Sequence, residues 1–188
     1  MFTKKTVLPK HIAMTDAARG IDPFKQLAML KPRDGLIFRH YELSKTERFV
    51  FGTKLRKACR KAQVLFLVAG NFQLGTQLKA DGLHLPSWAL KQGYDWRRQL
   101  NPGWTVSGAV HSTSELLMAQ RLEIDFAIVS PVFSTESHPD AKSLGTIGLA
   151  RLKQQTTLPV YALGGMNIKT SARLRSIGID GYAFASLT

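Results

Sequence analysis

The sequence predicts an α/β fold, a (β/α)8 barrel of the TIM type with parallel strands. Short apolar runs alternate with helical segments along the whole chain, which is typical of a parallel sheet. Eight such runs can be distinguished, enough to close a barrel. No Gly-rich fingerprint follows the first run, as the alternative, a dinucleotide-binding sheet, would require.

The predicted strands are short apolar runs bounded by polar or small residues. They cover residues 11–16, 35–39, 64–69, 82–85, 106–111, 126–129, 160–163 and 182–185. The predicted helices lie between them, at residues 23–30, 45–62, 72–79, 112–122, 147–155 and 168–177. Ser112 begins one of these helices with Glu115 in its first turn, a usual N-terminal pattern. Residues 86–90 are expected to form one turn at most.

Residues 1–188 are expected to form a single domain, because no linker or low-complexity tract divides them. Only Leu187 and Thr188 follow the last strand and Ser186, so the outer helix that completes a barrel is expected to be missing. A missing helix exposes apolar surface, which a second copy of the chain in a homodimer would cover.

The composition is that of an ordinary soluble domain, with 44% hydrophobic and 21% charged residues. No apolar run is long enough to cross a membrane, and the N-terminal residues lack a signal-peptide core. The single Cys59 excludes an internal disulfide. A cytoplasmic location is therefore predicted.

The net charge of +13 is concentrated in the first third of the chain, where residues 1–63 contain 15 Lys and Arg against 5 Asp and Glu. Residues 54–61 carry much of it. This segment lacks the interleaved aromatic residues and motifs of nucleic-acid-binding proteins. A solvated helix face is therefore favoured over the alternatives, a nucleic-acid or acidic-protein partner.

Two strand-and-turn segments in the last third of the chain point to a phosphate site. Gly164-Gly165 follows the first of these strands and Ala185-Ser186 follows the second. In a (β/α)8 barrel the loops after strands seven and eight commonly hold a phosphate on backbone N–H groups. A phosphorylated small molecule is therefore favoured over the alternative, in which Gly164-Gly165 simply makes a tight turn.

Several segments together resemble the thiamine phosphate synthase and thiazole tautomerase family. They are residues 80–85, 110–115, 128–135, 163–166 and 180–183. The resemblance implies a (β/α)8 barrel acting in thiamine biosynthesis. It implies a transferase that joins a hydroxymethylpyrimidine diphosphate to a thiazole phosphate and releases pyrophosphate with Mg²⁺. In the tautomerase branch, a thiazole phosphate is aromatised without a metal ion.

The resemblance also implies roles for individual residues. The phosphate of the thiazole would lie on Gly164, Gly165, Ala185 and Ser186. Pro131, Thr135 and His138 belong to the loop that faces the thiazole, and His138 is equally compatible with an exposed position. Arg39 would hold the diphosphate.

The chain departs from the family pattern at the diphosphate and metal positions. Of the Gln-x-Arg-x-Lys pattern after strand two, only Arg39 is present. Ala69-Gly70 stands where the family has an Asn-Asp pair, and Pro86-Ser87-Trp88-Ala89 replaces the second acidic motif. Mg²⁺ is expected from the family, but its carboxylate ligands are absent. Asp16 and Asn71 could compensate in part, although Asp16 is favoured as a helix start.

Acid–base candidates remain at two strand ends. The tautomerase branch uses a His in the strand-six loop, where this chain has Ser130-Pro131. His84 and His111 are the remaining proton-transfer candidates, and for both a hydrogen-bonded structural role is favoured. The sequence thus predicts a thiamine phosphate synthase-like protein. The alternatives are a non-catalytic phosphate-ligand-binding or regulatory member and a metal-independent tautomerase.

Overall fold

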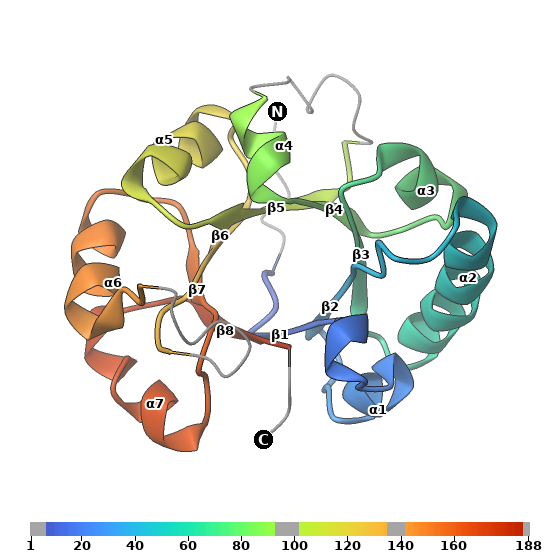
Figure 1. Cartoon of the computed structure of the whole chain (residues 1–188), viewed down its shortest axis with the longest axis horizontal. Coiled ribbons are helices and arrows are strands. Elements are labelled where there is room, and N and C mark those ends of the chain that lie inside the picture. The colour runs from blue at the N-terminus through green and yellow to red at the C-terminus, as the bar shows by residue number, and fades with distance from the viewer. Residues whose placement is uncertain (1–6, 93–101, 135–141, 186–188) are drawn as a thin grey trace.

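Eight parallel strands form a closed barrel in the computed structural model, which describes residues 7–92, 102–134 and 142–185. Each strand pairs with its neighbours in the sequence, and β8 closes the barrel against β1 (Figure 1). The strands are β1 (His11–Met14), β2 (Gly35–Phe38), β3 (Leu65–Ala69), β4 (Gly82–Leu85), β5 (Thr105–Val110), β6 (Phe126–Val129), β7 (Val160–Ala162) and β8 (Gly181–Phe184). The predicted barrel is confirmed, and each predicted strand agrees within two residues at either end.

The helices surround the barrel on its outer side (Figure 1). They are α1 (Pro23–Ala28), α2 (Lys45–Lys61), α3 (Phe72–Gln77), α4 (Ser87–Lys91), α5 (Thr113–Arg121), α6 (Gly145–Gln154) and α7 (Ile168–Ala172), with 3-10 helices η1 (Ala17–Arg19) and η3 (Arg175–Ile177). The turn expected at residues 86–90 is the short helix α4. The single helix expected over 168–177 is wrong: it is divided into α7 and η3. The division arises because the backbone there closes i→i+3 bonds, such as Ile177 N to Leu174 O at 3.1 Å.

Side chains alternate along each strand, so that one set faces the barrel interior and the other faces the helices, which gives two apolar layers. The barrel interior contains Ile12, Ile37, Leu67, Phe126 and Tyr161, each at most 1% exposed. The other set packs beneath the helices in two outer clusters, one under α1 to α3 and one under α4 to α7. The tight interior keeps the strand ends in fixed positions, and therefore fixes the loops that follow them.

Three helices end in the same way, with one non-Gly residue in the left-handed region. These residues are Gln63 (φ 56°), Lys79 (φ 50°) and Glu123 (φ 49°). In each case the next N–H reaches back five residues, as from Ala80 N to Gly75 O at 2.9 Å. This is the Schellman ending, which usually contains Gly. It turns the chain sharply into the next strand.

The basic face of α2 is partly solvated and partly paired. Leu55 and Cys59 are fully buried in the outer core, whereas Lys54, Lys57 and Lys61 are exposed, as the sequence predicts. Arg56 is the exception, because it forms a two-pronged ion pair with Asp81 at 2.7 Å and 2.7 Å. Part of the basic segment therefore joins α2 to the start of β4.

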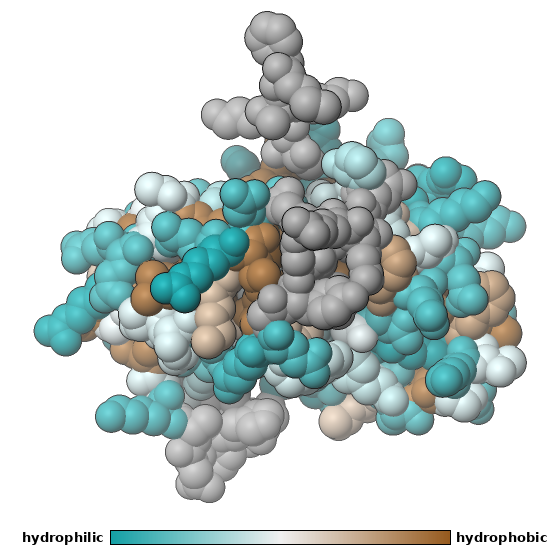
Figure 2. All heavy atoms as spheres, turned by 90° about the horizontal axis from the view of Figure 1, so that it is seen from above, coloured by the Kyte–Doolittle hydropathy of each residue, from teal (hydrophilic) through white to brown (hydrophobic). Residues whose placement is uncertain are grey.

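In the described part of the chain only Ala185 follows β8, which pairs with β1 where the barrel closes. Across this seam, Gln26 of α1 is fully buried and donates to Ala185 O at 2.8 Å. Hydrophilic residues predominate on the side of the molecule seen in Figure 2, with hydrophobic residues in smaller groups between them. The homodimer stays a prediction.

Among the described residues, none of the helices has the length and apolar character needed to span a membrane.

Candidate functional site

Three of the predicted site residues meet at the carboxyl ends of the strands. Arg39 follows β2, His84 lies within β4, and His111 follows β5. Burial is the main reason that the pKa of His84 is lowered, and Arg39 and His111 both lie close enough to His84 to contribute. The barrel therefore brings these three residues to one region, at the end where barrel enzymes place their active sites.

His84 is held inside the barrel as a neutral group. Leu83 and Leu85 on either side of it pack beneath the helices, so His84 faces the interior. It is 2% exposed, and its Nδ1 lies 2.9 Å from Ser107 Oγ. Burial lowers the pKa of His84 to about 3, with smaller contributions from Arg39 and His111. At neutral pH it offers hydrogen bonding without charge.

His111 reaches from β5 to the loop after β6. Its Nδ1 lies 2.7 Å from Ser130 O, and a carbonyl oxygen can only accept, so Nδ1 carries the hydrogen. In the neutral ring, Nε2 then keeps a lone pair. The exposed imidazole is therefore a proton acceptor beside the strand-six loop, although that loop itself contains no His at Ser130-Pro131.

Glu115 fixes the backbone from which His111 projects. The carboxylate is 3% exposed and accepts from His111 N at 2.6 Å, Ser87 Oγ at 2.7 Å and Lys91 Nζ at 3.0 Å. Burial alone would raise the pKa of Glu115, but these hydrogen bonds outweigh it and the pKa is lowered. Glu115 therefore stays ionised and joins α4 to the start of α5.

Arg39 is oriented by Thr15 and Asp16, which follow β1. Its backbone N donates to Thr15 Oγ1 at 2.9 Å, and its Nη1 lies 3.7 Å from Asp16 Oδ2. Asp16 also lies 3.5 Å from Arg19 Nε and caps η1 through Ala18 N at 3.2 Å. Asp16 thus starts only the short 3-10 helix η1, whereas Asp22 caps the helix predicted to follow, α1. The Asp16 carboxylate is therefore paired with two guanidinium groups, those of Arg19 and Arg39.

Aromatic side chains flank the end of β3, where the family pattern has its Asn-Asp pair. A Cβ added to Gly70 would lie 3.3 Å from Trp88 Cζ2 and 3.4 Å from Tyr41 Cε1. Trp88 is itself 52% exposed. The two rings thus enclose Gly70 in this chain, and a longer side chain at that position would have to displace them.

Arg48 is a site residue that the sequence analysis missed. It is 8% exposed, donates from Nη2 to Ala69 O at 2.8 Å, and lies over the Tyr41 ring at 5.0 Å. Burial lowers its pKa. The signal was present in α2, because Arg48 precedes Gly52, Leu55 and Cys59 at the i, i+4, i+7, i+11 spacing of a buried face.

Gly164 and Gly165 form the turn after β7, with φ values of 96° and 61°. Gly164 O accepts from Phe133 N at 3.1 Å, and a Cβ on Gly165 would lie 2.6 Å from Ser134 O. Tight packing against the strand-six loop therefore requires glycine here. Within the described ranges, no acceptor takes the N–H groups of Gly164 and Gly165. The turn is thus tight, and its role in binding phosphate stays a prediction.

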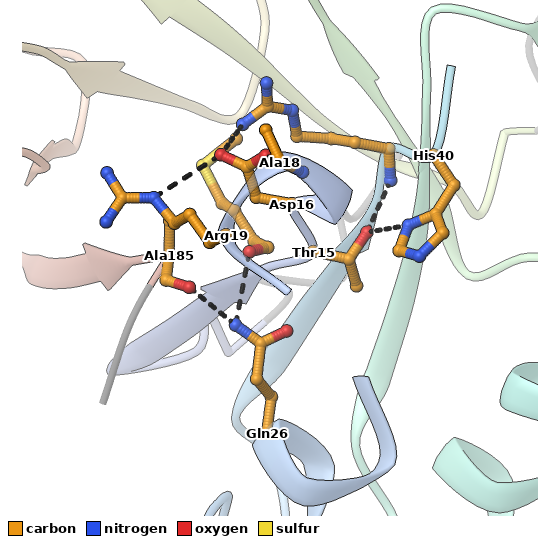
Figure 3. Close-up of polar contacts among 9 residues, drawn as sticks. Thr15, Asp16, Ala18, Arg19, Gln26, His40 and Ala185 are labelled. Atoms are coloured by element: carbon orange, nitrogen blue, oxygen red, sulfur yellow. Dashed lines mark hydrogen bonds and ion pairs between the residues drawn. The ribbon is translucent and has the colours of Figure 1, made fainter. Parts of the chain in front are cut away.

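The structure describes only some of the other residues predicted to contact the phosphate or the thiazole. Ala185 lies next to this turn in the barrel order, and its carbonyl is held by Gln26 (Figure 3). Pro131 packs against Gly164, because a Cβ there would lie 3.0 Å from Pro131 Cα. Thr135, His138 and Ser186 lie outside the described residues.

The described side chains do not fit a Mg²⁺ site. In that part of the chain, no three His, Cys, Asp or Glu residues lie together in a way that could hold a metal ion. Asp16 is paired with Arg19 and Arg39, and Asn71 caps α3 by accepting from Leu74 N at 2.9 Å. Mg²⁺ prefers carboxylate oxygens that are free to coordinate it. The alternative in which Asp16 and Asn71 compensate in part has no support in this geometry.

The family model described as "Thiamine monophosphate synthase" matches residues 25–187. This chain belongs to the thiamine monophosphate synthase family. The resemblance found in the sequence is confirmed. Among its relatives within the family, "Putative thiamine-phosphate synthase 2" of Aquifex aeolicus is 29% identical over 182 residues, which cover 94% of this chain and 97% of that protein.

A "Thiamine-phosphate synthase" of Pyrococcus furiosus is 27% identical over 140 residues, covering 74% of this chain and 67% of the relative. The solved structure "Thiamine phosphate pyrophosphorylase from Pyrococcus furiosus" superposes with a TM-score of 0.78 at 24% identity, covering 93% of this chain and 84% of that one. The structural likeness agrees with the barrel fold of this thiamine monophosphate synthase family member.

Proposed function

We propose that this protein acts in thiamine biosynthesis as a thiamine phosphate synthase-type barrel. It would bind a thiazole phosphate and join it to a hydroxymethylpyrimidine diphosphate, with release of pyrophosphate. Membership of the family supports the reaction class. The observation that supports a phosphorylated ligand is the Gly164-Gly165 turn, whose backbone N–H groups have no acceptor in the described part of the chain.

Backbone N–H groups suit the phosphate of such a ligand. The positive φ values of Gly164 and Gly165 shape a turn of the kind that forms anion-binding concavities. Because neither residue has a side chain, a phosphate can approach the backbone closely. Hydrogen bonds from this turn to the strand-six loop hold the N–H groups in place before the ligand arrives.

Arg39 is the cation that we assign to the diphosphate. Negative charge accumulates on the departing pyrophosphate, and a positioned guanidinium stabilises such charge through two parallel hydrogen bonds. Asp16 and Thr15 fix Arg39 at the mouth of the barrel. Since the described residues do not fit Mg²⁺, no step of this proposal passes through a metal ion.

Two observations favour other members of the same family. Among the described residues, no cluster of His, Cys, Asp or Glu could hold a metal ion, which favours a non-catalytic protein that binds a phosphorylated heterocycle or regulates through it. The position of His111 beside the strand-six loop favours a metal-independent thiazole phosphate tautomerase, because Nε2 could accept a proton there.

The deciding experiment measures product formation from hydroxymethylpyrimidine diphosphate and thiazole phosphate, with Mg²⁺ and with a chelator. Thiazole phosphate binding is measured in parallel by calorimetry. Turnover in chelator supports the proposal as stated. Turnover lost on chelation supports the synthase but overturns the metal-free assignment. Binding without turnover supports the non-catalytic alternative.

The role of Arg39 is tested with Arg39→Gln, and Arg19→Gln is the matched control. Both changes remove a guanidinium from Asp16, but only Arg39 is assigned to the diphosphate. We expect Arg39→Gln to lower turnover about a hundredfold to a thousandfold, the range for losing one charge-stabilising donor. Equal turnover in the two variants would remove Arg39 from the proposal.

A further inference from the structure

A basic pocket lies at the opposite end of the barrel from the candidate site. Its volume is about 510 Å³, within the usual range for small-molecule sites. It is formed where β2, β3 and β4 begin, and its lining includes Arg33, Arg56, Arg60, Gln63, Leu65 and Asp81. No residue of the candidate site contributes to it.

The charges of this N-terminal pocket are only partly neutralised. Arg56 is fixed by Asp81 at 2.7 Å from both carboxylate oxygens and donates to Lys79 O at 2.9 Å. Arg33 and Arg60 are exposed, and neither has an acidic partner among the residues that the structure describes. Within the described ranges, these two guanidinium groups therefore have no counter-charge, while Arg56 and Asp81 stiffen the wall beside them.

Arg33 occupies a backbone position that suits glycine. Asp34 N donates to Lys31 O at 3.0 Å, which closes a turn with Pro32 in its second position and Arg33 in its third. Arg33 has φ 74°, as in a type II turn, where this position favours Gly. Gln63, Lys79 and Glu123 adopt positive φ at helix ends, but Arg33 has no helix end to explain it. Strained residues of this kind cluster at ligand-binding sites.

We propose that the N-terminal pocket binds a phosphorylated small molecule, with Arg33 and Arg60 contacting its phosphate oxygens. Guanidinium groups match phosphate geometry better than ammonium groups do. Leu65 is half-buried in the lining and gives the uncharged part of the ligand an apolar contact. The site is separate from the Gly164-Gly165 turn and does not depend on the function proposed for it.

The test is calorimetric titration of the full chain with inorganic pyrophosphate, in an Arg39→Gln background so that the barrel mouth contributes less. Arg33→Gly removes the guanidinium and supplies the residue that the turn favours. We expect it to weaken pyrophosphate binding about tenfold, the effect of losing one charge-assisted contact, without lowering the melting temperature. Arg60→Ala should weaken binding similarly.

Arg151→Ala is the matched control, because it removes an exposed positive charge on α6, far from the pocket lining. We expect its affinity for pyrophosphate to be unchanged. The proposal is overturned if the Arg39→Gln chain binds no pyrophosphate, or if Arg33→Gly and Arg60→Ala bind as tightly as their parent. It is also overturned if Arg151→Ala weakens binding equally, since general attraction to the basic chain would then suffice.

Discussion

Two separate constraints require glycine at position 165, namely a positive φ and the lack of space for a Cβ. Gly178 also has a positive φ, of 72°, but a Cβ there would meet no atom within 4 Å. At Gly165 the same φ constraint is combined with overlap, since a Cβ would lie 2.6 Å from Ser134 O and 2.7 Å from Phe133 Cβ. The strand-six loop packed over the turn therefore determines that glycine must stand at position 165. The same packing positions the backbone N–H groups that we assign to the phosphate.

Gly165→Ala and Gly178→Ala separate these two constraints. We expect Gly178→Ala to lower the free energy of unfolding by about 1 kcal/mol, the cost of a left-handed residue. Gly165→Ala should cost roughly 2–4 kcal/mol, because overpacking is added. Urea unfolding measures both. Equal losses would show that the strand-six loop yields freely and does not fix the turn.

At the scale of elements, the helix ends decide how each helix returns to the barrel. Gln63, Lys79 and Glu123 all adopt the left-handed conformation without being glycine. Their Schellman bonds place the next residue, Val64, Ala80 or Ile124, in the outer core. Burial of that apolar residue compensates for the backbone cost and sets the start of β3, β4 and β6.

Lys79→Gly tests this interpretation of the helix endings. Gly adopts positive φ without strain, so the free energy of unfolding should rise by roughly 0.5–1 kcal/mol. Lys57→Gly, in the interior of α2, is the control and should lower it by about 1 kcal/mol. Thermal or urea unfolding gives both values. A loss of stability in Lys79→Gly would contradict the interpretation.

At the scale of the whole molecule, buried histidines make stability depend on pH. Burial lowers the pKa of His84 to about 3, and burial is also the main reason that the pKa of His40 is lowered. In the unfolded chain a His side chain has a pKa of about 6.5. As the pH falls below that value, the unfolded chain takes up protons that the folded chain cannot accept at these rings. Stability is therefore lost from about pH 6.5 downward.

His84→Gln isolates the contribution of the central ring. The wild-type chain should lose stability between about pH 6.5 and 5, by up to roughly 1.4 kcal/mol per pH unit for His84. The variant should lose less over the same interval, whatever its stability at neutral pH. Urea unfolding at both pH values measures the two slopes. Identical slopes would mean that His84 gains a proton easily in the folded barrel.

The sequence by itself determined the barrel and the family, because alternating apolar runs encode strands locally and the matching segments are contiguous. It also singled out Gly164, Gly165 and Arg39 as candidate site residues, since a glycine pair or a cation after a strand is visible in the sequence alone. The tertiary structure alone decided that Arg48 fills the end of β3, that Arg39 and Arg19 occupy Asp16, and that His111 reaches the strand-six loop. Each of these contacts joins residues from different elements. Which charged groups come together depends on how far side chains extend between elements of the barrel, and no local sequence pattern records this.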